Sequence, residues 1–135
     1  MRAVLDPNVL IAALLSPSGT PAQLLSRWIA GDFDLVISEP LLEELRRALR
    51  YPKLRRYIGA DDADEYVAFL ASAAVMAEQP ATATRHAPDP GDDYLLALAE
   101  NEHALLVSGD KHLLQLAGEL PIQTPAGFIA GLESR

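Results

Sequence analysis

The sequence of 135 residues contains no cysteine, one tryptophan and only 6% aromatic residues. Without cysteine, the chain can form neither disulfide bonds nor thiolate metal sites. No apolar run approaches the roughly 20 residues that a membrane-spanning helix needs. The first residues also lack the pattern of a signal peptide. We therefore expect a cytoplasmic protein with no membrane segment.

Basic residues are scarce as well, with 11 Lys and Arg against 19 Asp and Glu, a net charge of −8. This balance argues against a simple nucleic-acid binder, because phosphate binding normally needs a basic face. An acidic pocket can still hold RNA if cations neutralise it, so a nucleic-acid function would require metal ions. The basic residues are unevenly spread, and six of them cluster in one stretch: Arg46, Arg47, Arg50, Lys53, Arg55 and Arg56.

The composition is that of a globular protein, with 50% hydrophobic and 22% charged residues. The length fits one domain, and we find no linker or repeat, so we expect a single domain over residues 1–135. Short apolar runs that predict strands alternate with segments of helical spacing. The expected strands are 2–5, 33–38, 74–77, 104–108 and 121–123. The expected helices are 8–15, 22–30, the stretch from Pro40 to Tyr51, 53–58, 61–73, 92–101, a short helix to Leu116 and 125–132.

Alternating strands and helices favour an α/β fold, a three-layer α/β/α arrangement around a parallel sheet of four to five strands. Residues at the helix ends fit this assignment. Thr20 is a candidate N-cap followed by Pro21, Gly31 is placed to end the same helix, and Ser38 is a candidate N-cap followed by Pro40. In such sheets, ligands bind beyond the carboxyl ends of the strands.

Four acidic residues stand at or just beyond these strand ends, or at the start of a following helix. Asp6 and Asp110 follow the first and fourth strands, Glu44 lies early in the helix after the second strand, and Asp92 opens the helix before the fourth. Four carboxylates brought to one edge would repel one another unless a cation lay between them. Magnesium, manganese and calcium are the cations that carboxylate oxygens suit.

A purely structural explanation exists for each acid taken alone. Asp6 and Asp92 have the positions of helix caps, and Glu44 could face solvent. The explanation weakens for the set as a whole, because Asp6 lies within an apolar stretch where a lone buried charge is costly. Caps also do not require four acids at the same edge of the sheet.

Four segments carry a resemblance to a known family. Residues 4–11, 38–45, 92–99 and 106–110 are similar, in order, to the four conserved blocks of PIN domains. Residues 89–93 and 109–111 resemble the VapC-like members assigned as toxins of toxin–antitoxin pairs. The resemblance implies a metal-dependent endoribonuclease that hydrolyses RNA phosphodiester bonds with Mg²⁺ or Mn²⁺. It also implies a cognate antitoxin and a homodimer.

The resemblance also implies roles for single residues. Asp92 is preferred to Asp93 because the distance in sequence from Asp92 to Asp110 equals the distance between the last two acids of the family. Glu43 is the less favoured alternative to Glu44. Pro7 departs from the hydroxyl residue common at its position, and Ser108 replaces a frequent Thr. The catalytic, metal-binding acids would be Asp6, Glu44, Asp92 and Asp110. The auxiliary residues would be Asp93, Asn8, Ser38 and Ser108, and the candidate substrate-binding residues Lys111, Arg46 and Arg50.

Other interpretations remain open. An aspartyl-phosphate phosphatase would need a second Asp where Asn8 stands, and the acids of a phosphoreceiver domain do not line up. A non-catalytic PIN-like module that binds a partner or RNA is the main alternative. The three histidines lack zinc-ligand spacing and are expected at the surface. Trp28 and Tyr94 are expected to pack in the interior, and Trp28 and Leu70 are alternatively considered as exposed contacts for a partner.

Overall fold

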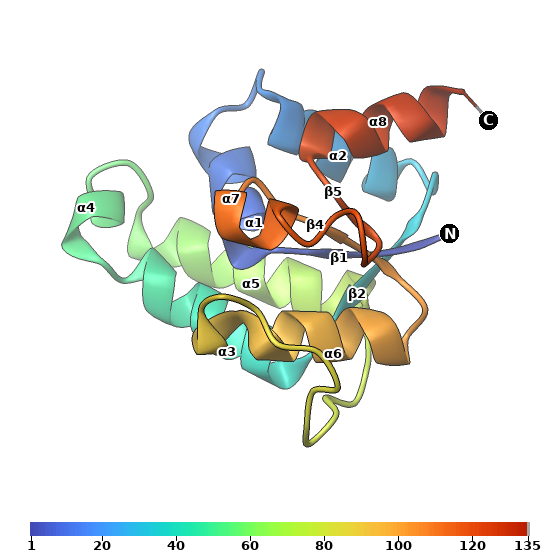
Figure 1. The fold of residues 1–135 in the computed structure, drawn as a ribbon. Helices are drawn as coiled ribbons and strands as arrows, with labels where there is room; N and C mark the ends of the chain where they lie inside the picture. Colours follow the sequence, from blue (N-terminus) through green and yellow to red (C-terminus); the bar gives the residue numbers. More distant parts are fainter. Residues whose placement is uncertain (135) are drawn as a thin grey trace.

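The computed structural model describes residues 1–134 and shows a five-stranded parallel sheet with helices packed against it (Figure 1). The strand order is β3-β2-β1-β4-β5, and every neighbouring pair is parallel. The predicted fold class is therefore confirmed. The strands are β1 (Arg2–Leu5), β2 (Asp34–Ile37), β3 (Val75–Met76), β4 (Leu105–Val107) and β5 (Ile122–Gln123).

The chain moves from β1 to β2 to β3 in one direction and then crosses back to β4 and β5 on the other side of β1. Since parallel crossovers are right-handed, this reversal distributes the connecting helices over both faces of the sheet. The helices are α1 (Pro7–Leu15), α2 (Thr20–Ile29), α3 (Glu39–Leu49), α4 (Pro52–Arg55), α5 (Ala60–Ala73), α6 (Asp93–Asn101), α7 (Lys111–Leu114) and α8 (Pro125–Glu133), with a 3₁₀ turn η1 (Pro90–Asp92) before α6.

The central strand β1 is fully covered, with Ala3, Val4 and Leu5 each at most 1% exposed. Helix α6 packs on β1 and β4, whereas α1 packs on α2 and α3, and α3 packs on α5. A parallel strand covered on both faces reads as a continuous apolar run, which is why residues 3–5 are recognisable in the sequence. The order of the strands reverses at β1, so the crevice beyond its carboxyl end is the expected ligand site.

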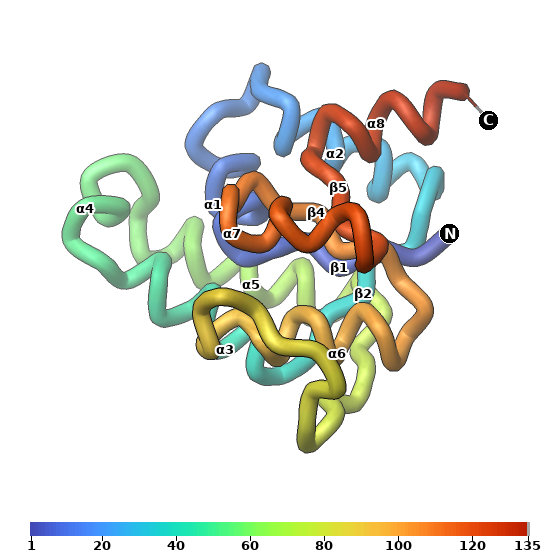
Figure 2. The backbone as a smooth tube through the Cα atoms, in the orientation of Figure 1, coloured from blue at the N-terminus to red at the C-terminus, as the bar shows by residue number. Residues whose placement is uncertain are grey.

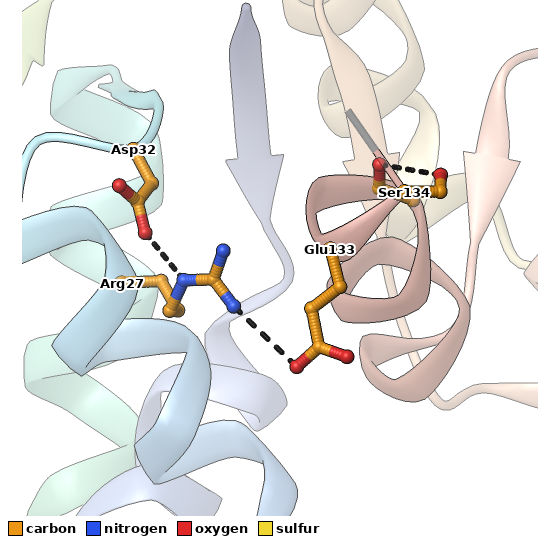
Figure 3. Close-up of polar contacts among 5 residues, drawn as sticks. Arg27, Asp32, Glu133 and Ser134 are labelled. Atoms are coloured by element: carbon orange, nitrogen blue, oxygen red, sulfur yellow. Dashed lines mark hydrogen bonds and ion pairs between the residues drawn. The ribbon is translucent and has the colours of Figure 1, made fainter.

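Helix α8 returns the end of the chain to α2, as the backbone trace shows (Figure 2). Arg27 of α2 pairs with Asp32 and reaches Glu133 of α8, with Nη1 3.6 Å from Oε1 (Figure 3). These groups are largely exposed, so the pairs contribute little to stability. The pair with Asp32 stays within α2 and the loop that follows it, and the pair with Glu133 joins α2 to α8.

Three helix ends differ in detail from the prediction. Gly19, not Thr20, is the N-cap of α2, since the helix begins one residue earlier than expected. Ser38 is the N-cap of α3, but its hydroxyl makes no capping hydrogen bond. Asp92 ends η1, and α6 begins at Asp93. Gly31 follows the end of α2 with φ of 87°, a conformation that favours glycine, as predicted.

The partner contacts considered at Trp28 and Leu70 are not available, because both side chains are buried. Trp28 packs instead against Phe69, with ring centroids 5.5 Å apart. Within residues 1–134, no single helix is long and apolar enough to cross a membrane. Taken together, the consecutive helices α1 and α2 would be long and apolar enough, but they are bent by 101° relative to each other, and the match rests on length and composition alone.

Candidate functional site

Asp6 is the one buried acid among the described residues and lies directly beyond β1. Its backbone N–H donates to the carbonyl of Val107 at 3.0 Å, which continues the pairing of β1 with β4 by one residue. Its carboxylate accepts the Ser108 hydroxyl at 2.7 Å and the backbone N–H of Asn8 at 3.0 Å. Burial raises the pKa of Asp6, although these two hydrogen bonds oppose the increase. The fold therefore holds a costly carboxylate in a fixed position.

Ser108 connects Asp6 to Asp110. Its fully buried hydroxyl donates to Asp6 and accepts the backbone N–H of Asp110 at 3.0 Å. Asp110 is the N-cap of α7, where its Oδ1 accepts the N–H of His112 at 2.8 Å. One hydroxyl thus fixes the loop ends that follow the two neighbouring strands β1 and β4.

Asp92 lies close enough to the other three acids to be affected by their charges. Its pKa is raised to about 6, first by partial burial and then by the charges of Asp6, Asp89, Asp110 and Glu44. The sequence did not indicate that the charge of Asp89 would also raise the pKa of Asp92. The Asp89 carboxylate accepts the N–H of Gly91 and so caps η1. The structure therefore brings the four predicted acids into one region of negative potential at the carboxyl edge of the sheet.

Glu44 enters this region from α3 and is half-buried. Its Oε2 accepts a hydrogen bond from the hydroxyl of Tyr94, which belongs to α6. Burial and the neighbouring Glu44 raise the pKa of Tyr94, so the phenol stays protonated and remains a donor. The expectation that Tyr94 packs against the core is confirmed, and its hydroxyl makes in addition a contact that was not expected. No local pattern marks this contact, because Tyr94 and Glu44 are 50 positions apart in the sequence.

Gln79, in the loop after β3, links Ser38 to Tyr94. The Ser38 hydroxyl donates to Oε1 of Gln79 at 2.8 Å, and Nε2 of Gln79 donates to the carbonyl of Tyr94 at 3.0 Å. Ser38 therefore acts on the acids only indirectly, through the start of α6, instead of contacting one of them. No motif marks Gln79, because it lies outside the four blocks.

Asp93 faces the preceding loop. Its carboxylate accepts the N–H of Ala87 at 2.7 Å and lies 2.8 Å from Nδ1 of His86. The hydrogen bond from His86 is the main reason that the pKa of Asp93 is lowered. In this structure Asp93 holds the loop against α6, and it is absent from the charges that act on Asp92.

The other candidates lie on the exterior of the site. Glu43 is exposed and pairs with Arg46 at 3.4 Å, whereas Glu44 faces Tyr94, and this difference favours Glu44 as the site residue. Arg46 also pairs with Glu39 at 3.5 Å. The remaining predicted residues, Asn8, Lys111 and Arg50, have exposed side chains.

The donor chemistry fits a hard divalent cation, since all four side chains are carboxylates whose charges act on one another. However, no three Asp, Glu or His side chains in residues 1–134 converge closely enough to hold a metal ion in this conformation. Glu44 is turned toward Tyr94, and Asp110 toward the N–H of His112. A cation here would have to draw the carboxylates closer together, and it could use Oε1 of Glu44 while Oε2 keeps its hydrogen bond from Tyr94.

Comparisons with known proteins support the fold described above. An uncharacterised protein of Methanocaldococcus jannaschii is 27% identical over 143 residues, covering 98% of this chain and 92% of the relative. VapBC2 from Rickettsia felis, solved with a DNA fragment from its promoter, has a TM-score of 0.66 at 16% identity, covering 92% of this chain and 98% of that chain.

Two further solved structures share the fold. PAE2754 from Pyrobaculum aerophilum gives a TM-score of 0.67 at 18% identity, covering 100% of this chain and 91% of that chain. FitAcB from Neisseria gonorrhoeae gives 0.60 at 18% identity, covering 92% of this chain and 98% of that chain. A family model described as PIN domain matches residues 2–112, a stretch that contains all four acids. The chain belongs to the PIN-domain family.

Proposed function

We propose that this protein is an endoribonuclease that hydrolyses RNA phosphodiester bonds with Mg²⁺ or Mn²⁺. Members of the family are generally nucleases that use divalent metals. The observation that carries the proposal is the position of the acids: Ser108 joins the buried Asp6 to Asp110 at the ends of two neighbouring strands, and Asp92 and Glu44 lie near enough for charge interactions. Glu44 and Asp110 help to raise the pKa of both Asp6 and Asp92, a repulsion that capping does not explain and that a bound cation would relieve.

In this proposal the cation is held by Asp6, Glu44, Asp92 and Asp110. When bound, a divalent cation lowers the pKa of a water molecule and neutralises charge on a phosphate. The protein's own contribution is to position the ligands. Ser108 holds Asp6 in place, and Tyr94 orients Glu44.

Substrate binding is proposed for three basic residues. Lys111 directly follows Asp110 at the start of α7 and is exposed, so it can reach a phosphate at the acids. Arg50 is exposed at the end of α3, whereas the guanidinium of Arg46 already forms ion pairs with Glu39 and Glu43. Of the two arginines, Arg50 is therefore the more available.

The protein is further proposed to be the toxin of a toxin–antitoxin pair, bound by a cognate antitoxin and active as a homodimer. The resemblance of residues 89–93 and 109–111 to VapC-like toxins supports this assignment. The shared fold with the R. felis VapBC2 structure is consistent with it. A neighbouring small reading frame whose product co-purifies with this chain would support the pairing.

Cleavage of labelled single-stranded RNA tests the enzymatic proposal. We expect cleavage with Mg²⁺ or Mn²⁺ and none with EDTA. Asp6→Asn and Asp110→Asn should abolish it, while Glu65→Gln, which changes an exposed acid of α5, should behave as the wild type. Full activity of purified Asp6→Asn or Asp110→Asn, or of the wild type in EDTA, would contradict the proposal. A folded wild type that binds Mn²⁺ but cleaves no RNA would favour the non-catalytic module.

A further inference from the structure

The corner between α3 and α4 contains a surface pocket of about 650 Å³ that is lined almost entirely by arginine. Its lining residues are Arg50, Pro52, Arg55 and Arg56. Arg50 and Arg55 also line a smaller pocket next to it, of about 190 Å³. We propose that the larger pocket binds a backbone phosphate of the RNA strand, at a distance from the acids. This inference rests on the proposed function, because it takes RNA to be the substrate.

Local backbone structure brings the three arginines together. Helix α3 ends before Tyr51-Pro52, and α4 then forms a tight turn in which the N–H groups of Leu54 and Arg55 donate to the carbonyl of Tyr51 at 2.9 and 3.1 Å. The buried Ile58 fixes the following residues to the core. Arg50 therefore stands before the turn and Arg56 after it, facing one concave surface.

None of these arginines forms an ion pair among the described residues, although Asp64 lines the smaller pocket together with Arg50 and Arg55. The ion pairs of residues 1–134 involve Arg2, Arg27, Arg46 and Arg85, together with His86, and none of the three pocket arginines. This is unusual in a chain with 19 acids and a net charge of −8. Three guanidinium groups around one concavity repel one another, and an anion that they share relieves that repulsion.

The lining favours phosphate over a protein segment. A guanidinium binds phosphate through two parallel hydrogen bonds, and arginine is the residue most suited to that geometry. Protein interfaces, in contrast, depend on buried apolar or aromatic anchors. Apart from Pro52, the pocket offers no apolar residue to a partner.

One of the four acids and one of the pocket arginines belong to the same helix, α3. Glu44 and Arg50 are six residues apart on α3 and its C-cap, which corresponds to roughly 9 Å along the axis at 1.5 Å per residue. A strand whose scissile phosphate lies at the acids could place another phosphate at this corner. The pocket would then fix the register of the strand without reading its bases.

Binding of a fluorescein-labelled single-stranded RNA 12-mer, followed by anisotropy in EDTA, tests the proposal without cleavage. The variant Arg55→Ala/Arg56→Ala removes two exposed side chains outside the core. We expect its affinity to fall about 10-fold and the slope of log K against log salt to become shallower by about 0.7, the value for one lost phosphate contact in a single strand. Arg50→Ala should produce about half of that change in slope.

The matched control Arg2→Ala/Arg85→Ala removes the same charge from residues outside the corner, and it should change binding little. Equal losses in both double variants, or wild-type binding by Arg55→Ala/Arg56→Ala, would overturn the proposal. Wild-type protein that does not bind the RNA, or equal competition by polyglutamate of the same charge, would also overturn it. Because no step needs metal or cleavage, a failed nuclease assay leaves this result independently interpretable.

Discussion

The hydroxyl of Tyr94 donates a hydrogen bond to Oε2 of Glu44, joining the first turn of α6 to the middle of α3. Glu44 is the only one of the four acids that comes from α3, and this contact joins it to the helix that begins directly after Asp92. A group that orients a metal ligand typically affects metal affinity or activity by 10- to 100-fold.

Tyr94→Phe should therefore weaken Mn²⁺ binding by about 10-fold or more while leaving the fold intact, because it removes only the oxygen that orients Glu44. Isothermal titration with Mn²⁺ measures the affinity, and circular dichroism checks the fold. Tyr57→Phe, at a side chain that is 73% exposed, is the control and should bind as the wild type. Unchanged Mn²⁺ affinity in Tyr94→Phe would show that Glu44 needs no such orientation.

Ser108→Ala should reduce stability by about 1–3 kcal/mol, because it leaves the buried carboxylate of Asp6 and the N–H of Asp110 without their shared partner. Chemical denaturation at neutral pH measures the change. Ser72→Ala is the matched control, since the Ser72 hydroxyl is exposed and bonds only to a carbonyl of its own helix; its effect should stay within about 0.5 kcal/mol. Equal stability of the two variants would contradict the bridging role of Ser108.

The metal-free protein should lose stability as the pH rises from about 4 to about 6. Asp92 has a pKa of about 6 in the folded protein and an ordinary, lower pKa when unfolded, so the folded state binds more protons over this window. Protonated Asp92 stabilises the folded state fully at a pH below the pKa that Asp92 has in the unfolded chain. This stabilisation is lost as the pH rises through the pKa of Asp92 in the folded protein. The raised pKa of Asp6 acts in the same direction.

Thermal melts in EDTA across this pH range measure the effect. Asp92→Asn should flatten the dependence, because an amide does not titrate. Glu65→Gln should leave the dependence as in the wild type. A decline in Asp92→Asn as steep as in the wild type would show that the charge on Asp92 is not the cause.

The sheet and the position of the acids could be predicted because they follow from local pattern. The apolar run of residues 3–5 marks a strand covered on both faces; Asp6 directly follows it, and Asp110 stands three positions after the end of the neighbouring strand β4. When two parallel strands are neighbours in a sheet, their carboxyl ends also lie next to each other, as those of β1 and β4 do. The fold thus brings together acids that are 104 positions apart in the chain.

The contacts between side chains could not be predicted in the same way. Gln79 and Tyr94 meet across 15 positions, and Tyr94 and Glu44 across 50, so both contacts depend on how α6 packs beside α3. The spacing of apolar residues predicts which face of a helix is buried, but it does not predict which polar group a side chain of that helix contacts. The same limit explains why the sequence leaves both a buried and an exposed Trp28 open: its burial involves Phe69 of α5, a distant part of the sequence.

The proposed nuclease activity requires that Asp6, Glu44, Asp92 and Asp110 form one binding site for a divalent cation. The most direct measurement is the melting temperature of the wild type and of the four single variants Asp6→Asn, Glu44→Gln, Asp92→Asn and Asp110→Asn, each with Mn²⁺ and with EDTA. A cation that binds only the folded state stabilises it by RT ln(1 + [L]/Kd), so Mn²⁺ should raise the melting temperature of the wild type and much less that of each variant. A wild type whose melting temperature Mn²⁺ does not change, or variants that all keep the full increase, would contradict the metal site on which the proposed nuclease depends.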